Sequence, residues 1–573
     1  MLKIKIQGGL HMKKTIYLFI VMMLTLSLAG CATSTETEGA STSGEVIETT
    51  IEEVSETVNE ARSESVETSE ASEASETSET SETSETSETS ETSEASEASE
   101  ASEASETSEA SEVTETSEVT TVSASTSSNE ISLNNESITI TEAGTYTISG
   151  SLDKGQIIID AGDDDDVELV LNNVTITCDY SAPIYVKNAD DVTITLEGDA
   201  NVLSINADIS DNADSVDGVI YSKTDLTFEG SGTLSISSDY THGIVGKDDV
   251  EFVSGTYKID VAKDGLQVND SVTVMDSTMS ITSSKDGIQV DNDEDEDKGY
   301  VYFEDSIITI NAGEDAINAT NYVRVVSGDY TIDSGEDGIQ ADQYIYISGG
   351  TFDITTGGGY QGVLNIITVG EGSGGTVSET DQLTESMKAI KSNDITVDGG
   401  TITISSYEDG FNADNDVEIN GGLITINSGD EAITAKNALV INDGTIIIEN
   451  GYEGLEGVYI TINGGNITID VLDDGINGGE SYSLVTIAGG NLSVTCQGDG
   501  LDSNGDMVIS GGTIVLDVSA IYTGGDGNVD VTGTLTYTGG TIVDADGITI
   551  DPTVESTGGG GGIMPGPGGG GRR

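Results

Sequence analysis

The sequence predicts an all-β protein folded as a parallel β-helix, and two observations lead to this fold class. Short runs such as "TITIS", "LITIN" and "NITID" alternate apolar and polar residues, and most of their apolar residues are β-branched. Alternation of this kind is typical of strands. The runs also return at a single spacing of roughly 22 residues, which is the signature of a solenoid built from repeated coils.

The repeat can be followed at the apolar residue that comes directly after the small residue of each turn. Most successive members of this series lie 21 or 22 positions apart, and the longer steps contain insertions. Turn glycines form a second series with the same spacing, because glycine adopts positive φ without steric cost. We expect about 14 coils, each burying inward Ile and Val side chains against its neighbours. An array of β-sandwiches is the alternative fold, and the single period argues against it. The apolar series is Ile244, Leu266, Ile288, Ile317, Ile339, Ile390, Phe411, Ile433, Leu455, Ile476 and Leu501.

Residues 1–31 have the features of an export signal whose true start is Met12. Two lysines precede an apolar run that is too short to span a membrane comfortably. The run ends in "LAGC", which resembles a bacterial lipobox and implies cleavage before Cys31 and attachment of lipid to its sulfur. An ordinary signal peptide with a chance cysteine is the alternative. We therefore expect a protein anchored by Cys31 to the outer face of the cell membrane, with no other membrane contact.

Two low-complexity segments flank the predicted solenoid. Residues 32–128 repeat Ser-Glu-Thr and Ser-Glu-Ala triplets, which offer no apolar surface to bury and repel one another. We expect this segment to be a disordered, extended stalk. Residues 129–556 contain the repeats and form the predicted β-helix domain. Residues 557–573 are rich in glycine and are expected to be a disordered tail.

Charge and composition narrow the possible partners. The chain carries 104 Asp and Glu against 19 Lys and Arg, a formal net charge of -85. Such a polyanion repels phosphate backbones, so we do not expect nucleic acid as a partner. Cations, or ligands bridged by cations, fit better. The chain has no Trp and two His. We expect Cys178 and Cys496 to be small buried residues and not a disulfide.

Acidic residues return at the same turn position in most coils. Equivalent positions in a β-helix lie about 4.8 Å apart, so the stacked carboxylates repel one another. Raised pKa values, interleaved lysines or bound cations can offset this repulsion. Carboxylate and amide oxygens suit Ca²⁺, the cofactor we expect. The alternative is that Asp-Gly simply makes good turns. The candidate ligands are Asp286, Asp291, Asp315, Asp337, Asp342, Glu408, Asp409, Asn412, Asp414, Asp430 and Glu431.

Three stretches resemble a known family. They are the segment from Thr145 to Val186, the run "AIKSNDITVDGGTITISSYEDGFNADNDVEINGG" and the run "GDGLDSNGDMVISGGTIVL". All three are similar to bacterial surface carbohydrate-binding lipoproteins folded as right-handed parallel β-helices. The resemblance implies binding of cellulose or of acidic sugars such as polygalacturonate, calcium in the solenoid, and a shape similar to that of pectate lyases. The matching turn after Asp430 has Lys436 where the family pattern has Asp or Asn.

We therefore expect a monomer that binds extracellular polysaccharide without turnover. Calcium would bridge uronate carboxylates to the acidic turns, whereas neutral sugars would need aromatic surfaces. A calcium-dependent lyase is one alternative, in which Lys263 or Lys285 would abstract a proton. A scaffold or adhesin that binds other proteins is the other alternative. The candidates for sugar stacking are Tyr322, Tyr344, Tyr346, Tyr360 and Tyr407.

Overall fold

The computed structural model of the chain describes residues 120–122, 129–210, 215–363, 367–368, 376–377, 385–519 and 527–555. The predicted export signal with Cys31, the tail, and the stalk apart from strand β1 (Thr120–Val122) lie outside the described residues. Strand β1 pairs with β3 (Ile138–Ile140), so the sheet extends upstream of residue 129. Within the described residues, no helix is long and apolar enough to cross a membrane.

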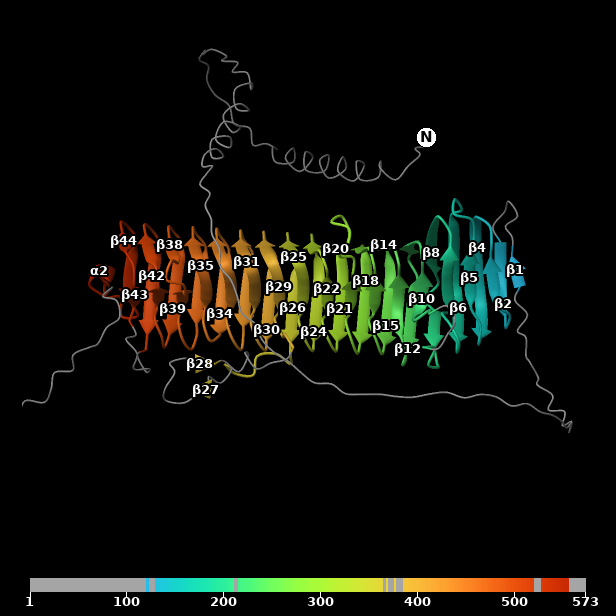
Figure 1. The fold of residues 1–573 in the computed structure, drawn as a ribbon, viewed down its shortest axis with the longest axis horizontal. Coiled ribbons are helices and arrows are strands. Elements are labelled where there is room, and N and C mark those ends of the chain that lie inside the picture. The colour runs from blue at the N-terminus through green and yellow to red at the C-terminus, as the bar shows by residue number, and fades with distance from the viewer. Residues whose placement is uncertain are drawn as a thin grey trace, which may run out of the picture. The chain divides into compact units, whose positions relative to one another are not determined.

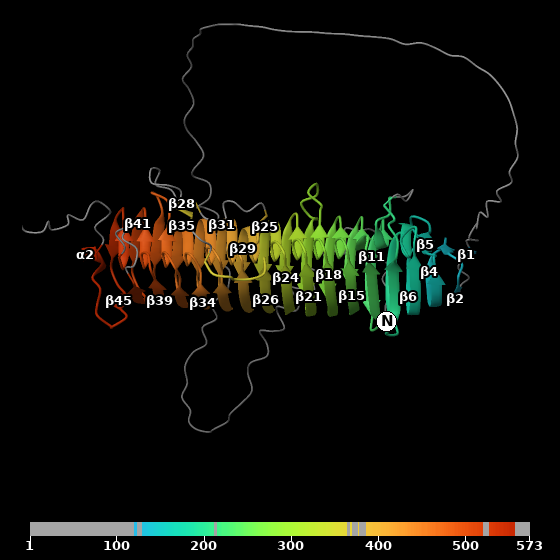
Figure 2. The ribbon, with the colours of Figure 1, turned by 90° about the horizontal axis from the view of Figure 1, so that it is seen from below.

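The fold is an all-β parallel solenoid of about 15 turns, which confirms the predicted fold class and is close to the predicted number of coils. Forty-three strands join in one continuous sheet, and each pairs in parallel with the equivalent strand one coil away. Figures 1 and 2 show the strands following one another from the blue to the red end of the solenoid. The pairings define three stacks, here called ladders 1, 2 and 3, which each coil visits in turn.

Ladder 1 contains β1, β3, β5 (Ile157–Asp160), β7 (Ile184–Asn188), β10 (Gly218–Ser222), β13 (His242–Gly246), β16 (Leu266–Val268), β19 (Ile288–Val290), β22 (Ile317–Ala319), β37 (Ile476–Gly478), β40 (Leu501–Ser503) and β43 (Val529–Val531). Ladder 2 contains β2 (Asn129–Asn134), β8 (Asp191–Glu197), β11 (Asp225–Gly230), β14 (Asp249–Phe252), β17 (Ser271–Met275), β20 (Tyr300–Glu304), β23 (Tyr322–Val325), β38 (Leu484–Ile487), β41 (Asp506–Ile509) and β44 (Leu535–Tyr537).

Ladder 3 contains β9 (Asn201–Ile205), β12 (Thr233–Ser238), β15 (Gly255–Val261), β18 (Ser277–Ser283), β21 (Ser306–Ala312), β24 (Gly328–Ser334), β26 (Thr351–Thr356), β30 (Thr401–Ser406), β32 (Leu423–Asn427), β34 (Thr445–Asn450), β36 (Asn466–Asp470), β39 (Asn491–Cys496), β42 (Thr513–Val518) and β45 (Thr541–Asp544). Longer strands serve ladders 1 and 2 together: β25 (Ile339–Ile347), β29 (Ile390–Val397), β31 (Phe411–Ile419), β33 (Ile433–Ile441) and β35 (Leu455–Ile462). Strands β4 (Gly144–Asp153) and β6 (Val167–Cys178) serve ladders 2 and 3. A separate antiparallel pair, β27 (Ile367–Thr368) and β28 (Thr376–Val377), and the short helix α2 (Pro552–Glu555) complete the elements.

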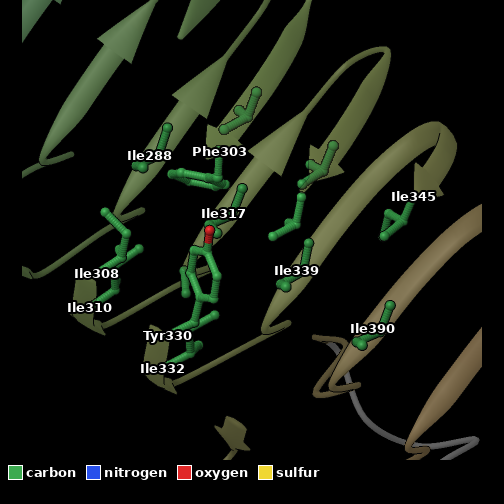
Figure 3. Close-up of a cluster of buried hydrophobic side chains, with 14 of the residues drawn as sticks. Ile288, Phe303, Ile308, Ile310, Ile317, Tyr330, Ile332, Ile339, Ile345 and Ile390 are labelled. Atoms are coloured by element: carbon green, nitrogen blue, oxygen red, sulfur yellow. The ribbon is translucent and has the colours of Figure 1, made fainter. Parts of the chain in front are cut away.

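The core runs inside the coils as one cluster of alternating inward side chains. Every member of the predicted apolar series is buried. Figure 3 shows Ile288, Ile317, Ile339 and Ile390 on successive strands of ladder 1. The predicted turn glycines also adopt positive φ, for example 99° at Gly422, so a side chain there would strain the backbone.

Phe411 occupies the core position that Ile390 and Ile433 fill in the neighbouring coils. The two cysteines, Cys178 and Cys496, are also buried, and both are free thiols, as predicted. The repeat pattern therefore identified the inward positions correctly, whatever apolar residue occupies them.

We predict that Phe411→Ala lowers the free energy of unfolding by about 3–5 kcal/mol, because the ring is fully buried and its loss leaves a cavity that neighbouring coils cannot fill. Urea unfolding followed by circular dichroism measures the change. The control is Tyr482→Ala, which removes a side chain that is 64% exposed and should change stability by less than about 0.5 kcal/mol. Equal losses in the two variants would contradict the assigned core position.

Candidate functional site

The predicted acidic column exists and lies in the turns that lead into ladder 1. Asp286, Asp315, Asp337 and Asp409 occupy equivalent positions in this column, and all four are buried. Buried carboxylates are costly unless other groups compensate their charge. The candidate site is therefore best located by asking how each part of the column is compensated.

Backbone hydrogen bonds compensate much of the column. The N–H of Asp315 donates to the Asp286 carboxylate at 2.9 Å, and the N–H of Asp337 donates to Asp315 at 2.8 Å. The Asp337 carboxylate accepts the N–H of Lys388 at 2.8 Å. Further along the solenoid, the N–H of Asp499 donates to the Asp474 carboxylate in the same way, at 2.6 Å. In these coils each acid holds the backbone of the next turn. This is a structural role, in line with the alternative that the acids serve the turns.

Side chains that replace an acid compensate other parts. The two residues that interrupt the acidic column are His242 and Lys388. His242 Nδ1 accepts the backbone N–H of Asp264 at 3.3 Å, and Lys388 Nζ lies 3.1 Å from Glu408. Burial lowers the pKa of Lys388, but the carboxylates around it outweigh that effect and raise it overall. Lys388 therefore stays charged within the column.

Lysines from the outward strand positions also reach predicted ligands. Lys391 Nζ lies 2.8 Å from the Asp337 carboxylate. Lys436, which stands where the family pattern has an acid or amide, forms an ion pair with Asp414. Asp337 and Asp414 are thus engaged by lysines rather than left for a metal ion.

Protonation is the third form of compensation. Burial raises the pKa of Asp315 to about 8, and the charges of Asp337 and Asp286 add to this rise. Burial likewise raises the pKa of Asp286 to about 7, with a further contribution from Asp264. Burial raises the pKa of Asp474 to about 7 although the Asp499 N–H opposes the rise.

One group of acids differs from the rest of the column. Oxygens of Asp409, Asp430 and Glu431 lie within 4.8 Å of one another. In the described part of the chain, the carboxylates of Asp409 and Glu431 accept no backbone N–H from the next coil, and Glu431 has no cation at ion-pair distance. Burial raises the pKa of Asp409 to about 6, although Lys388 opposes the rise. Burial also raises the pKa of Glu431 well above its ordinary value, and Asp409 and Asp430 add to this rise.

These three acids line a cleft of about 500 Å³, here called the acidic cleft. Asn412 donates its amide N–H to Asp409, which leaves the amide oxygen available as a ligand. Together with the three acids, this amide gives the cleft a set of carboxylate and neutral oxygens. Ca²⁺ takes six to eight oxygen ligands, largely carboxylates and neutral oxygens. This donor set therefore fits calcium, and Asp409, Asp430 and Glu431 are the residues that would hold it.

The remaining predicted ligands lie apart from the acidic cleft or are otherwise engaged. Asp291 accepts a hydrogen bond from Gln289 at 2.6 Å, and Asp342 is exposed. Glu408 lines the cleft but accepts the N–H of Met387 at 2.7 Å as well as Lys388 Nζ. The sequence pattern did not single out Lys388 as part of the cleft, although this lysine interrupts the acidic column.

The two lysines proposed as lyase bases are poorly suited to that role. Lys285 Nζ lies 3.0 Å from the Glu314 carboxylate, and this hydrogen bond raises the pKa of the lysine. A lysine that acts as a base near neutral pH needs a lowered pKa. Lys263 lies one coil before Lys285, beside Asp264. Neither lysine lines the acidic cleft.

The five candidate tyrosines divide into two groups. Tyr322, Tyr344 and Tyr346 share the outer face of ladder 2. Tyr360 donates its hydroxyl to the side chain of Asn450 at 3.3 Å, and Tyr407 follows the end of β30. The structure thus brings three of the five candidates together on one surface.

The chain is thus a β-helical protein with acidic turns. Solenoids of this class present an extended surface to their ligands. Residues 134–326, 319–432 and 430–559 each match the family of carbohydrate-binding domain-containing proteins. Together these matches cover most of the chain, which therefore belongs to this family.

The chain is also similar to one curated protein and to one solved structure. A carbohydrate-binding domain-containing protein of Acetivibrio thermocellus is 36% identical over 134 residues, which are 22% of this chain and 46% of the relative. The chain thus spans about half the length of that relative. A solved structure of a polysaccharide lyase-like protein from C. thermocellum, a gadolinium derivative, is 31% identical. The match covers 40% of this chain and 96% of the solved one, with a TM-score of 0.36.

We predict that Asp315→Asn stabilises the solenoid at high pH. The pKa of Asp315 is about 8 in the folded state and close to 4 in an unfolded chain. The folded state therefore binds the extra proton, and its stability falls as pH rises from about 4 through about 8. The variant should melt at a higher temperature than the parent at pH 9, and the difference should vanish at pH 5.

Thermal melts in EDTA at both pH values test this prediction. Asp353→Asn is the matched control, because it removes the same charge from an exposed position on β26. If Asp315→Asn instead destabilises the protein equally at pH 9 and pH 5, the prediction is wrong and the carboxylate is needed as an anion.

Proposed function

We propose that this protein binds acidic extracellular polysaccharide through Ca²⁺ held in the acidic cleft, without cleaving the chain. Family membership supports carbohydrate binding in general. The observation that carries the finer proposal is that oxygens of Asp409, Asp430 and Glu431 lie within 4.8 Å of one another in the acidic cleft. A cation there would stabilise the charged forms of Asp409 and Glu431, whose pKa values are raised by burial and by neighbouring carboxylates.

Charge makes a bridging cation the natural link to an acidic sugar. A chain of net charge -85 repels a polyuronate at long range. Calcium that is held by three protein carboxylates keeps coordination positions for further oxygens. A uronate carboxylate could take these positions, so that protein and polysaccharide share the ion. Polygalacturonate is the ligand that this chemistry favours, and cellulose would have to bind elsewhere, on tyrosine surfaces.

The cellular setting follows from the sequence features that precede the solenoid. We propose that the chain is lipid-anchored at Cys31 and that the Ser/Glu/Thr-rich segment holds the solenoid away from the membrane as a monomer. Binding without turnover is favoured over lyase activity, because the hydrogen bond from Lys285 to Glu314 raises the pKa of the lysine and neither Lys263 nor Lys285 lines the acidic cleft.

The central prediction concerns calcium-dependent retention on polysaccharide. In affinity electrophoresis, the purified protein should be retarded more strongly by polygalacturonate in Ca²⁺ buffer than in EDTA, with no unsaturated product in the ultraviolet absorbance. Glu431→Gln should weaken retention about tenfold, since it removes one charged ligand of the ion. Asp353→Asn is the control and should bind as the parent does. Formation of product would identify a lyase, and failure to bind in either buffer would favour a scaffold.

Calcium should also stabilise the fold. A ligand that binds only the folded state at 100 times its Kd adds about 2.7 kcal/mol of stability. Differential scanning calorimetry of the parent should therefore show a lower melting temperature after chelation, and Glu431→Gln should show a smaller effect. An identical melt in calcium and in EDTA, with no metal detected by elemental analysis, would reject the calcium site.

A further inference from the structure

A second surface gathers aromatic residues around a single arginine. Strands β20, β23 and β25 are neighbours in ladder 2, and their outward side chains form two rows across three coils. One row is entirely tyrosine, and the other has an arginine between two tyrosines. We call this surface the tyrosine–arginine face; its residues are Tyr300, Tyr322 and Tyr344 in the first row and Tyr302, Arg324 and Tyr346 in the second.

The first row is a rigid stack of rings. The centroids of Tyr300 and Tyr322 are 4.8 Å apart with an interplanar angle of 2°, and those of Tyr322 and Tyr344 are 4.8 Å apart with an angle of 7°. Both ring faces of Tyr322 are therefore covered by other rings. What the row presents outward is ring edges and hydroxyl groups. A sugar could stack on the outer face of Tyr344, which is 41% exposed and pairs in register with the much smaller Asp394.

The second row holds the only arginine of the described residues. Its guanidinium carbon lies 5.4 Å from the centre of the Tyr346 ring, and Tyr302 is its neighbour on the other side. Arg324 is exposed and has no carboxylate at ion-pair distance among the described residues. By contrast, Lys298, Lys388 and Lys391 are all ion-paired. An unpaired guanidinium is an unusual feature in a chain of net charge -85.

The carboxylates at the edge of this face are engaged by the tyrosines. Tyr302 donates its hydroxyl to Glu304 at 2.7 Å, and Tyr346 donates to Asp398. Neither carboxylate is at ion-pair distance from Arg324. The ring of Tyr346 also holds the guanidinium in place from one side. The arginine is thus pre-positioned, flanked by aromatic rings, with its donors available to a ligand.

We propose that the tyrosine–arginine face binds a carboxylated sugar unit directly, without a metal ion. Guanidinium and carboxylate match in a planar, two-bond geometry that lysine does not reproduce. The neighbouring tyrosine hydroxyls and ring edges supply hydrogen bonds and apolar contact for the sugar, at low conformational cost because the stack is already ordered. This inference rests on the proposed function for the class of polymer, and it adds a second, calcium-independent contact that is separate from the acidic cleft.

Charge and family membership together favour a uronate over a protein partner. The face carries one unpaired positive charge and five tyrosines, in a chain that belongs to a carbohydrate-binding family. One carboxylate per sugar unit provides an anion wherever the polymer meets Arg324. A neutral polymer such as cellulose could use the tyrosines but would leave the guanidinium without a partner.

The test separates the two contacts by removing calcium. The full chain is measured in EDTA against polygalacturonate and against its fully methyl-esterified form by affinity electrophoresis. The parent should be retarded by polygalacturonate and not by the ester, which has lost the carboxylate. Arg324→Gln should bind about tenfold more weakly, the loss expected for one charge-assisted contact. Arg324→Lys should be intermediate, because it keeps the charge and loses the planar fork.

Lys258→Gln is the matched control, since it removes one exposed positive charge from β15 on ladder 3. It should bind as the parent does, and all three variants should keep the parent melting temperature. Equal weakening by Lys258→Gln and Arg324→Gln would overturn the inference, because net charge alone would then explain binding. Calcium-dependent binding with no retardation in EDTA would overturn it while leaving the proposed function intact, whereas no binding in either buffer would reject the proposed function itself.

Discussion

Register between coils is the constraint on which the rest of this structure depends. Parallel pairing sets every side chain about 4.8 Å from its equivalent in the next coil. For Ile and Val inside the coils this spacing gives continuous apolar contact from one end of the core to the other. For the acidic turns the same spacing brings like charges together. A single geometric rule therefore both builds the core and creates the electrostatic problem outside it.

The groups that compensate the repulsion between carboxylates differ from coil to coil along the acidic column. These differences help to locate the candidate site. Asp286, Asp315 and Asp337 each bind the backbone N–H of the next coil, so these acids hold turns together. Lys388 replaces an acid outright and neutralises its neighbours. At Glu431 neither device operates among the described residues. A half-buried carboxylate without such compensation is stabilised by protonation or by a cation. For this reason we propose the calcium contact at the acidic cleft and not evenly along the solenoid.

The sequence was sufficient for the features that depend on the repeat alone. The inward positions, the turn glycines and the stacking of acids follow from spacing, and all were predicted, including the place of Phe411. It was not sufficient for features that depend on side-chain direction. Spacing cannot distinguish an aspartate that accepts a backbone N–H from one that faces a cleft, so Asp315 and Asp409 looked equivalent. Nor could it show that Tyr322 would have both ring faces covered, although tyrosines 22 positions apart on ladder 2 had to stack. Arg324 lies at the same spacing between Tyr302 and Tyr346, so the sequence did contain a signal for this surface.

In a repeat protein, the departures from the repeat are the natural places to look for function. A residue that serves the fold can recur in every coil, because the same contact recurs. A ligand of limited size touches a few coils, so the residues that bind it are confined to those coils. Arg324 is confined in this way, and so is the group formed by Asp409, Asp430 and Glu431. The two surfaces also lie on different parts of the coil, one in the turn before ladder 1 and one on ladder 2. A long polymer can contact both only if it crosses the coils or if separate chains occupy them, and one contact needs calcium whereas the other does not. Removal of calcium should therefore lower the affinity for an acidic polysaccharide without abolishing it.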